Sequence, residues 1–280
     1  MLRQNRSEHR TQPLHAASPL DKAQFAARQP AEDTLLDLYS RYFDLVPADT
    51  IELKREAFRL RYQVYCVENA FENPADHPDG LETDEFDDRS VHSLLVYRPT
   101  GALTGTVRLI LPQPDTQGID LPIGRICGEE LIADLGLPAS RTAEISRFAV
   151  SKAFRRRVSD VTVVDNGFQG FGRTSPRQGA AEGRVLPHIT LGLMKAVVKM
   201  SVENGITHLV AVMEPALLRL LGRIGIKFRN IGPLVHYHGL RQPCYAELDP
   251  LLEGILFERP DALEVITDHS RYWRPRLVEA

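Results

Sequence analysis

An acid and a base lie three positions apart in the segment TAEISRFAV, residues 142–150, whose apolar residues are typical of a buried strand. Because successive side chains of a strand point to opposite faces, we expect Glu144, Ser146 and Phe148 on one face and Ile145, Arg147 and Ala149 on the other. An unpaired ion inside an apolar sheet is costly, so each charge needs a partner. Beside other apolar runs stand Arg61, Asp84, Asp87 and Arg108. The sequence predicts that these residues form one charged cluster.

The composition is that of a folded protein with a substantial core. Of the 280 residues, 43% are hydrophobic, which suits one large domain or two small ones. The net charge of -3 argues against general nucleic-acid binding, which needs a basic face. No apolar run approaches the roughly 20 residues that span a bilayer, and the polar first residues do not resemble a secretory signal. Three distant cysteines suit a reducing compartment, so we expect a soluble cytoplasmic protein.

Charge is distributed unevenly along the sequence. Between residues 68 and 88 every charged side chain is acidic, whereas residues 141–184 are rich in arginine. Either block can be a solvated loop or part of a site, and charge patterning alone leaves this open.

The elements that position these residues follow from apolar periodicity and turn signals. Residues 1–33 are polar and predict a flexible tail. An amphipathic segment is expected over 35–46, and helices over 51–67, near 127–135, over 189–203 and over 215–224. Strands are expected over 91–97, 102–111, 144–151, 206–213, 228–237 and 244–248. A long irregular loop is expected over 154–186 and a helical extension over 251–280.

This order of elements predicts an α/β (α+β) protein. Its mixed, mostly antiparallel sheet is expected to carry helices on both faces. We expect residues 34–250 to form one domain, with 251–280 packed on the same domain.

Four motifs in order resemble those of the acyl-homoserine-lactone synthases and their relatives, the N-acyl amino acid synthases. They comprise FRLRYQVY with Arg61 and Tyr65, an E-x-D-x-[YF]-D motif met by Glu82, Asp84, Phe86 and Asp87, a G-x-x-R-L motif met by Gly105, Arg108 and Leu109, and an E-x-S-R motif met by Glu144 and Arg147. The resemblance covers roughly residues 35–248, and its motifs are specific as a set. Where the synthases place a tryptophan, this chain has Phe71.

The resemblance implies the GNAT N-acyltransferase fold and the transfer of an acyl chain from a thioester to an amine. The nearest subgroup it suggests is the acyltransferases associated with exosortase and PEP-CTERM systems. The departure at Phe71 and the extra length place the chain nearer to the amino-acid branch than to the lactone synthases, whose amine donor is S-adenosylmethionine.

Glu144 is the candidate catalytic base for that reaction. An amine attacks only when it is uncharged, so the site must remove a proton. A carboxylate flanked by arginines is expected to be strongly ionised and therefore a weak base, which favours a relay through an ordered water. The alternative is that Glu144 pairs with Arg61 or Arg108 and holds the sheet to the helix.

The remaining candidate site residues fall into two groups. Asp84 and Asp87 can hold an ammonium group or lock arginines in bidentate pairs, with a solvated acidic loop as the alternative. Structural and positioning roles in a buried ion-pair network with these acids are expected for Arg61, Arg108 and Arg147. Candidate substrate contacts are Tyr65, Phe71, Ser146, Phe148 and Met194, the last on a helix whose apolar residues are mostly ordinary core.

The acyl donor is predicted to be an acyl carrier protein. The coenzyme A pattern Q/R-x-x-G-x-G/A is common in GNAT proteins, but here Gln169 and Gly172 are followed by Thr174. A carrier protein is acidic and brings its own pantetheine arm, so an arginine-rich rim suits it. The candidate carrier contacts are Arg155, Arg156, Arg157, Arg173, Arg177 and Arg184. No permanently bound cofactor is expected.

The sequence offers little support for other chemistry. His236 and His238 lie on one face of a predicted strand, but no third metal ligand is evident. No Ser-His-Asp or nucleophilic cysteine arrangement stands out, which favours direct transfer to the amine. The predicted function is an N-acyltransferase that joins a fatty acyl group to an amino acid or a derivative. The alternatives are a coenzyme A-dependent acyltransferase, a lactone synthase that uses S-adenosylmethionine, and a non-catalytic acyl-chain sensor.

Overall fold

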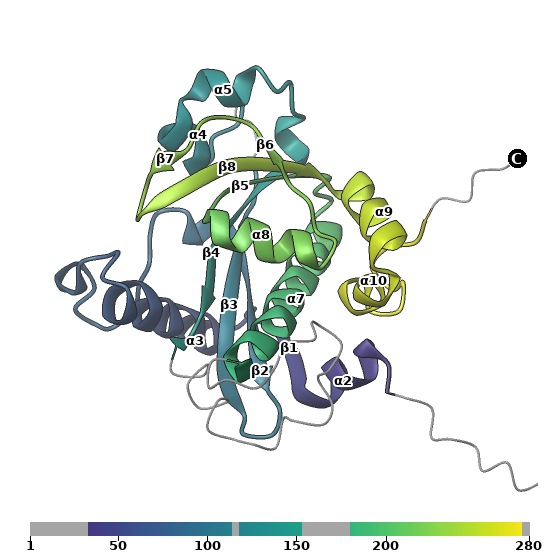
Figure 1. Cartoon of the computed structure of the whole chain (residues 1–280). Helices are drawn as coiled ribbons and strands as arrows, with labels where there is room; N and C mark the ends of the chain where they lie inside the picture. Colours follow the sequence, from purple (N-terminus) through teal and green to yellow (C-terminus); the bar gives the residue numbers. More distant parts are fainter. Residues whose placement is uncertain (1–32, 114–117, 153–179, 276–280) are drawn as a thin grey trace, which may run out of the picture. The chain divides into compact units, whose positions relative to one another are not determined.

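The computed structural model describes residues 33–113, 118–152 and 180–275, with the backbone alone over 180–187 (Figure 1). Its helices are α2 (Leu35–Tyr42), α3 (Ile51–Tyr62), α4 (Pro122–Cys127), α5 (Glu129–Ala133), α7 (Ala180–Glu203), α8 (Pro215–Arg223), α9 (Leu248–Glu258) and α10 (Pro260–Thr267). A π-helical segment, Gln63–Glu68, continues α3, and short 3-10 turns span Pro74–Asp76, Asp87–Arg89 and Ala139–Arg141. The strands are β1 (Phe43–Pro47), β2 (Ser90–Tyr97), β3 (Ala102–Ile110), β4 (Thr142–Val150), β5 (His208–Met213), β6 (Arg229–Asn230), β7 (Val235–His236) and β8 (Leu240–Glu247).

The strands of the described residues form a mixed, mostly antiparallel sheet. Their order is β1-β2-β3-β4-β5-β8-β6, and β7 pairs with β8. The pairing of β4 with β5 is parallel, and the other pairings are antiparallel. Helices α3 and α7 both pack on β3, α7 through its long apolar run (Figure 1). The predicted fold class is therefore confirmed.

Alternation along β3 separates the apolar core from the charged face. Val107 and Leu109 are fully buried in the main core together with residues of α7. Arg108, between them, points to the opposite face and is only 1% exposed there. Gly105 lets α7 approach the sheet closely, because a Cβ at this position would lie 3.2 Å from Leu193. The face of the sheet that packs on α7 is thus apolar, and the opposite face holds buried charged side chains.

The predicted amphipathic segment over 35–46 divides into a helix and a strand. Thr34 caps α2 by accepting from the Asp37 amide, and Asp37 accepts from the Thr34 amide in return. The helix ends at Tyr42, and Phe43 takes an extended conformation with φ of -127°. From there β1 pairs antiparallel with β2. In this short stretch the apolar residues fit both a helical and a strand pattern, so the sequence did not show where the helix ends and the strand begins.

Two other predicted boundaries are wrong. The single strand expected over 228–237 is two short strands, β6 and β7, because Pro233 lies between them and has no backbone N–H for a ladder. The helix expected over 189–203 begins at Ala180, so the irregular loop expected up to 186 ends earlier. The apolar period starts only at Ile189, whereas the preceding turns rest on good helix formers such as Ala181 and Glu182.

The two last helices belong to the same core as the sheet. α10 packs on α7 and α2, and α9 packs on β8. Leu252 and Ile255 of α9 and Val265 and Ile266 of α10 are at most 1% exposed within the main core. Over the described residues, none of the helices combines the length and apolarity that a membrane crossing needs.

Candidate active site

A bulge in β4 decides where its charged side chains point. β3 and β4 pair at Thr106 with Ala149 and at Arg108 with Ser146, so two residues of β4 lie opposite Val107 alone. One of the two is Arg147, whose φ of 48° lies in the left-handed region. A bulge of this kind bends a strand and re-aims a side chain.

The alternation predicted for this strand is therefore wrong beyond Ser146. Arg147 reaches the same face as Ser146, where both contact the charged cluster, and Phe148 packs against the main core instead. Ala149 returns to the α3 side and packs with Leu60 and Val64. The extra residue of the bulge shifts the alternation by one position.

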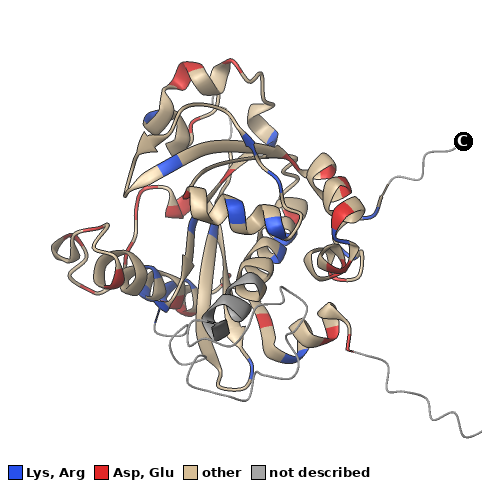
Figure 2. Ribbon diagram, in the orientation of Figure 1, with Lys and Arg blue, Asp and Glu red and all other residues tan. Residues whose placement is uncertain are grey.

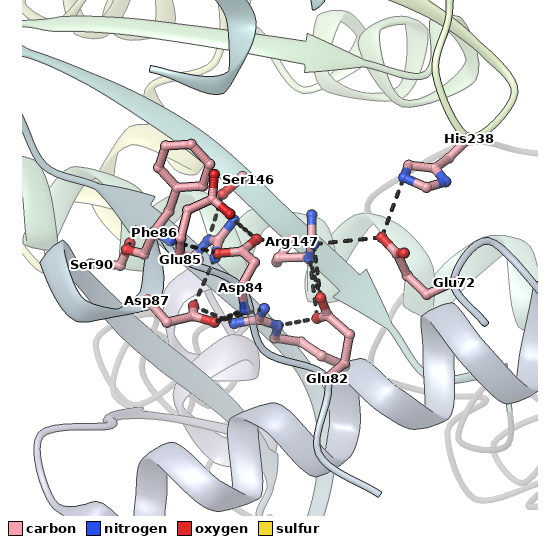
Figure 3. Close-up of polar contacts among 12 residues, drawn as sticks. Glu72, Glu82, Asp84, Glu85, Phe86, Asp87, Ser90, Ser146, Arg147 and His238 are labelled. Carbon is pink, nitrogen blue, oxygen red and sulfur yellow. Dashed lines mark hydrogen bonds and ion pairs between the residues drawn. The ribbon is translucent and has the colours of Figure 1, made fainter. Parts of the chain in front are cut away.

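Three arginines and three carboxylates form a largely buried, charge-balanced cluster on this face. Figure 3 shows Glu82, Asp84 and Asp87 of this cluster together with Arg147. Arg61, on α3, donates to both oxygens of Asp87 at 2.6 and 3.1 Å and also to Glu82. Arg108 donates to both oxygens of Asp84 and, at 2.7 Å, to Asp87. The partners of Arg147 are Glu82 at 2.8 Å and Asp84 at 3.1 Å. The acidic loop after α3 thereby ties this helix to β3 and β4.

The cluster keeps its acids ionised. Although burial raises their pKa values, the adjacent arginines outweigh it and lower the pKa of Glu82, through Arg61 and Arg147, to about 2. Arg61 and Arg108 likewise bring the pKa of Asp87 to about 2, and Arg108 lowers the pKa of Asp84. These contacts fit the ion-pair network that the sequence predicted. Figure 2 shows the same juxtaposition, with basic residues inside β3 and β4 near acidic ones.

Glu144 stands apart from this network. Glu144 is 3% exposed, and its Oε2 accepts a hydrogen bond of 2.8 Å from the backbone amide of Ile123 in α4. Burial raises its pKa to about 7, against the smaller lowering effects of the Ile123 amide and of Arg108 and Arg147. The expected strong ionisation is thus wrong, because burial of Glu144 outweighs the pull of the two arginines, which are paired with the loop acids. The alternative pairing with Arg61 or Arg108 is not among the ion pairs of the described residues.

A small cavity of about 120 Å³ lies beside Glu144. Its walls come from the π-helical segment after α3, the acidic loop, β3, β4, β5, α4 and the β7–β8 hairpin. The polar lining residues are Tyr65, Asp84, Arg108, Glu144, Ser146, Arg147, Tyr237, His238 and Arg241. Ser146 also accepts from Nε of Arg108 at 2.9 Å, and the Arg147 guanidinium lies 5.2 Å from the centre of the Tyr65 ring.

A larger cavity of about 400 Å³ adjoins it where β4 and β5 part. The parallel register that joins these strands ends at Ile145 and Ala211, yet β4 continues to Val150 and β5 to Met213. Apolar residues of both strands and of α8 line the opening: Phe148, Val150, Val212, Met213, Leu217 and Leu220. Six residues line both cavities: Tyr65, Ile145, Ser146, Arg147, Val212 and Arg241.

The β7–β8 hairpin and the segment after α3 meet at the edge of the site. Nε2 of His238 lies 3.3 Å from Glu72, and Nη2 of Arg147 lies 3.7 Å from the same carboxylate (Figure 3). Phe71, which lines the larger cavity, lies 5.9 Å from the His238 ring and 6.2 Å from the Tyr65 ring. His238 therefore has a carboxylate partner, and among the described residues no metal-binding group of histidine, cysteine, aspartate or glutamate is found.

The structure assembles most of the site residues that the sequence suggested. Tyr65, Phe71, Ser146 and Phe148 line one or both cavities. Met194 is 1% exposed within the main core and is not among the lining residues, whereas Thr190 of the same helix is. The suggested carrier contacts Arg155, Arg156, Arg157, Arg173 and Arg177 lie outside the described residues, as does the side chain of Arg184.

Several residues of the site were missed by sequence reasoning. Ile123 offers only a backbone amide, which leaves no trace in the sequence. Glu72, Tyr237 and Arg241 lie in a polar loop and a short hairpin far apart along the chain, and only their convergence makes them part of a site. Glu82 appeared as a motif residue, and its near-complete burial between two arginines gives it the central place in the cluster.

Comparison with known proteins agrees with this architecture. Residues 60–164 match the model of the acetyltransferase (GNAT) domain. No curated protein matches the sequence. Among solved structures, TofI in a ternary complex with an inhibitor and MTA is similar, with 18% identity over 76% of this chain and 96% of that one, and a TM-score of 0.50.

Two further solved structures are similar at lower TM-scores. BjaI, described as a CoA-dependent acyl-homoserine lactone synthase with SAM and isopentyl-CoA, is 20% identical over 84% of this chain and 91% of its own, with a TM-score of 0.49. FeeM, an N-acyl amino acid synthase from uncultured soil microbes, is 18% identical over 78% and 97%, with a TM-score of 0.46.

The domain match and the sheet with its parting strands define the class of this protein. It carries a GNAT acetyltransferase domain and is an acyltransferase of that fold.

Proposed function

We propose that this protein is an N-acyltransferase that moves a fatty acyl group from a thioester carrier to the amine of an amino acid or a derivative. Glu144 acts as the base. The observation that carries the proposal is the state of this carboxylate, which is buried beside a cavity with a pKa raised to about 7. A general base works best when its pKa lies near the operating pH.

The reaction proceeds by direct attack. Glu144 takes a proton from the acceptor nitrogen, directly or through one water, while the nitrogen forms a bond to the thioester carbonyl carbon. The carbon–sulfur bond then breaks, and the thiolate takes up a proton. An amine and a thioester thus become an amide and a thiol. The cluster of Arg61, Arg108 and Arg147 with the loop acids supports this step by holding β3 and β4 rigid and by leaving Glu144 without a strong counter-charge.

The larger cavity supports a donor with an extended arm and an acyl chain. Its volume of about 400 Å³ lies in the range of small-molecule sites, roughly 300–1,000 Å³. Its walls are mainly apolar, and it meets the smaller cavity at Ser146 and Arg147, so a thioester that lies in it presents its carbonyl near Glu144. The arginines between 155 and 184 favour an acidic carrier protein over free coenzyme A.

A paired-donor assay tests the function. The purified protein is given acyl carrier proteins and coenzyme A thioesters of the same chain lengths together with a pool of amino acids and simple amines, and mass spectrometry detects new amides. We expect amides from the carrier-protein donors and far less from coenzyme A donors. Equal amide formation from both donors would support the transfer reaction but contradict the proposed preference for a carrier protein.

The role of Glu144 is tested with a matched pair of variants. Glu144→Gln keeps the acceptor for the Ile123 amide but cannot take a proton, so we expect amide formation to fall by about 10²–10⁴-fold. Glu129→Gln makes the same change at an exposed position on α5 and should leave activity unchanged. Full activity in Glu144→Gln would contradict the role of Glu144 as the base. No amide from wild type with any donor would contradict the transfer function and favour an acyl-chain sensor.

A further inference from the structure

Three arginines line the small cavity, and they differ in their partners. Arg108 and Arg147 are both held by carboxylates of the acidic loop. Arg241, on β8 opposite Val235, is half-buried and lines both cavities. Its Nη1 donates to its own neighbour, the Leu240 carbonyl, at 3.3 Å, and no ion pair joins it to an acid of the described residues. Arg241 thus brings an unneutralised positive charge to the site.

The setting of Arg241 prepares it to bind an anion. Its guanidinium carbon lies 5.5 Å from the centre of the Phe71 ring, which gives the planar group a surface to rest on. Among the described residues, one hydrogen bond of the guanidinium is found, so its other N–H donors can meet a ligand, and its fork matches the two oxygens of a carboxylate. Partial burial strengthens such a pair, because water screens it less than at an open surface.

We propose that Arg241 binds the carboxylate of the acceptor, so that the acceptor is an amino acid with a free carboxylate. This inference rests on the proposed N-acyltransferase function. Glu144 and Arg241 line the same small cavity from different strands, β4 and β8. An amino acid carries the two matching groups, an amine for Glu144 and a carboxylate for Arg241.

The size of the small cavity fits this acceptor. Its volume of about 120 Å³ is several times the roughly 10–15 Å³ that admits one water molecule. That space takes an amino group, a carboxylate and the carbon between them, while a side chain extends beyond it. Acceptor recognition then depends on the charged end, and Arg108 and Arg147 do not compete for it because they are already paired.

The test compares amino acids with their carboxamides, which lack the negative charge. Glycine, leucine, tyrosine and glutamine are each offered as acid and as carboxamide to wild type, with a saturating acyl donor. We expect wild type to favour the acid in kcat/KM. In Arg241→Met, which keeps a chain of similar length, kcat/KM for the acid should fall about tenfold or more, mainly through KM, while the value for the carboxamide stays near wild type. Arg241→Lys should restore part of the preference.

The control and the contradicting results separate recognition from mere packing. Arg219→Met removes an exposed arginine of α8 and should change neither substrate. If Arg241→Met lowers acid and carboxamide equally, Arg241 is a wall residue and the inference is wrong. A wild type without preference for the acid refutes it as well.

Calorimetry keeps the inference testable if transfer itself fails. The same four acids and carboxamides are titrated into wild type and Arg241→Met without a donor. Tighter binding of an acid that disappears in Arg241→Met supports the carboxylate site even when no amide forms, and that pattern would contradict only the proposed function. Equal binding of acid and carboxamide by wild type contradicts the inference.

Discussion

The backbone amide of Ile123 donates a hydrogen bond of 2.8 Å to the buried carboxylate of Glu144. This single donor holds the side chain in place without neutralising it. The three arginines nearby are committed to the acidic loop, so burial dominates and the pKa rises to about 7. Strand β4 therefore carries an arginine with strong ion pairs, Arg147, and, three residues earlier, a carboxyl group with a raised pKa, Glu144.

The first prediction concerns the pH dependence of activity. The base must be ionised to accept a proton, so kcat/KM should rise with pH and level off above an apparent pKa near 7. The acceptor amine has its own titration, and two acceptors with different amine pKa values separate the two effects. The apparent pKa due to Glu144 should stay near 7 with both acceptors, while the apparent pKa due to the amine should change with the acceptor. A profile that follows only the amine contradicts the role of Glu144.

The second prediction concerns stability and has a defined sign. The folded-state pKa of Glu144 is raised above its ordinary value of 4.5, so its stabilising contribution is complete below about 4.5 and is lost as pH rises through about 7. Glu144→Gln has no such titration. The free energy of unfolding of the variant minus that of wild type should therefore increase between pH 4.5 and pH 8. The increase should be at most about 3 kcal/mol. Urea denaturation at both pH values measures this, and a pH-independent difference would refute the raised pKa.

The third prediction concerns the ion cluster. Arg61 is fully buried, and Arg61→Met would leave Glu82 and Asp87 short of a partner in a water-poor place. We expect a loss of about 3–5 kcal/mol in the free energy of unfolding. Arg59→Met, two residues earlier on α3, removes an exposed arginine and should change stability by less than about 0.5 kcal/mol. A loss in Arg61→Met as small as that in Arg59→Met would contradict the prediction that the two acids are left buried without a partner.

The fourth prediction concerns the bulge at Arg147. Its φ of 48° favours glycine over residues with a Cβ. Both Arg147→Gly and Arg147→Ala remove the ion pairs, so their difference reports the backbone. The glycine variant should be at least as stable as the alanine variant, although glycine in a strand or helix interior is normally about 0.5–1 kcal/mol worse. Thermal unfolding measures the order, and a clearly more stable alanine variant contradicts the strained conformation.

The sequence predicted the elements that have a long, clean period. The hairpin of β2 and β3, the β4 strand and helix α8 lie close to their expected places. Predictions failed where two patterns overlap or where a turn residue interrupts a strand, as at β1 and between β6 and β7. The alternation in β4 failed for a different reason, because the bulge at Arg147 arises from pairing with β3 and not from local composition.

The sequence by itself determined which charges must be buried together. Arg61, Asp84, Asp87, Arg108 and Arg147 stand in or beside apolar runs, and buried ions need partners. Only the tertiary structure decided how the charges are shared. Among the described residues, the arginines of the cluster pair with the loop acids, Glu144 accepts from the backbone amide of Ile123 and forms no ion pair, and Arg241 lines the same cavity without an ion pair of its own. A pKa depends on the distances and burial of all neighbouring groups, and these exist only once the distant strands are packed.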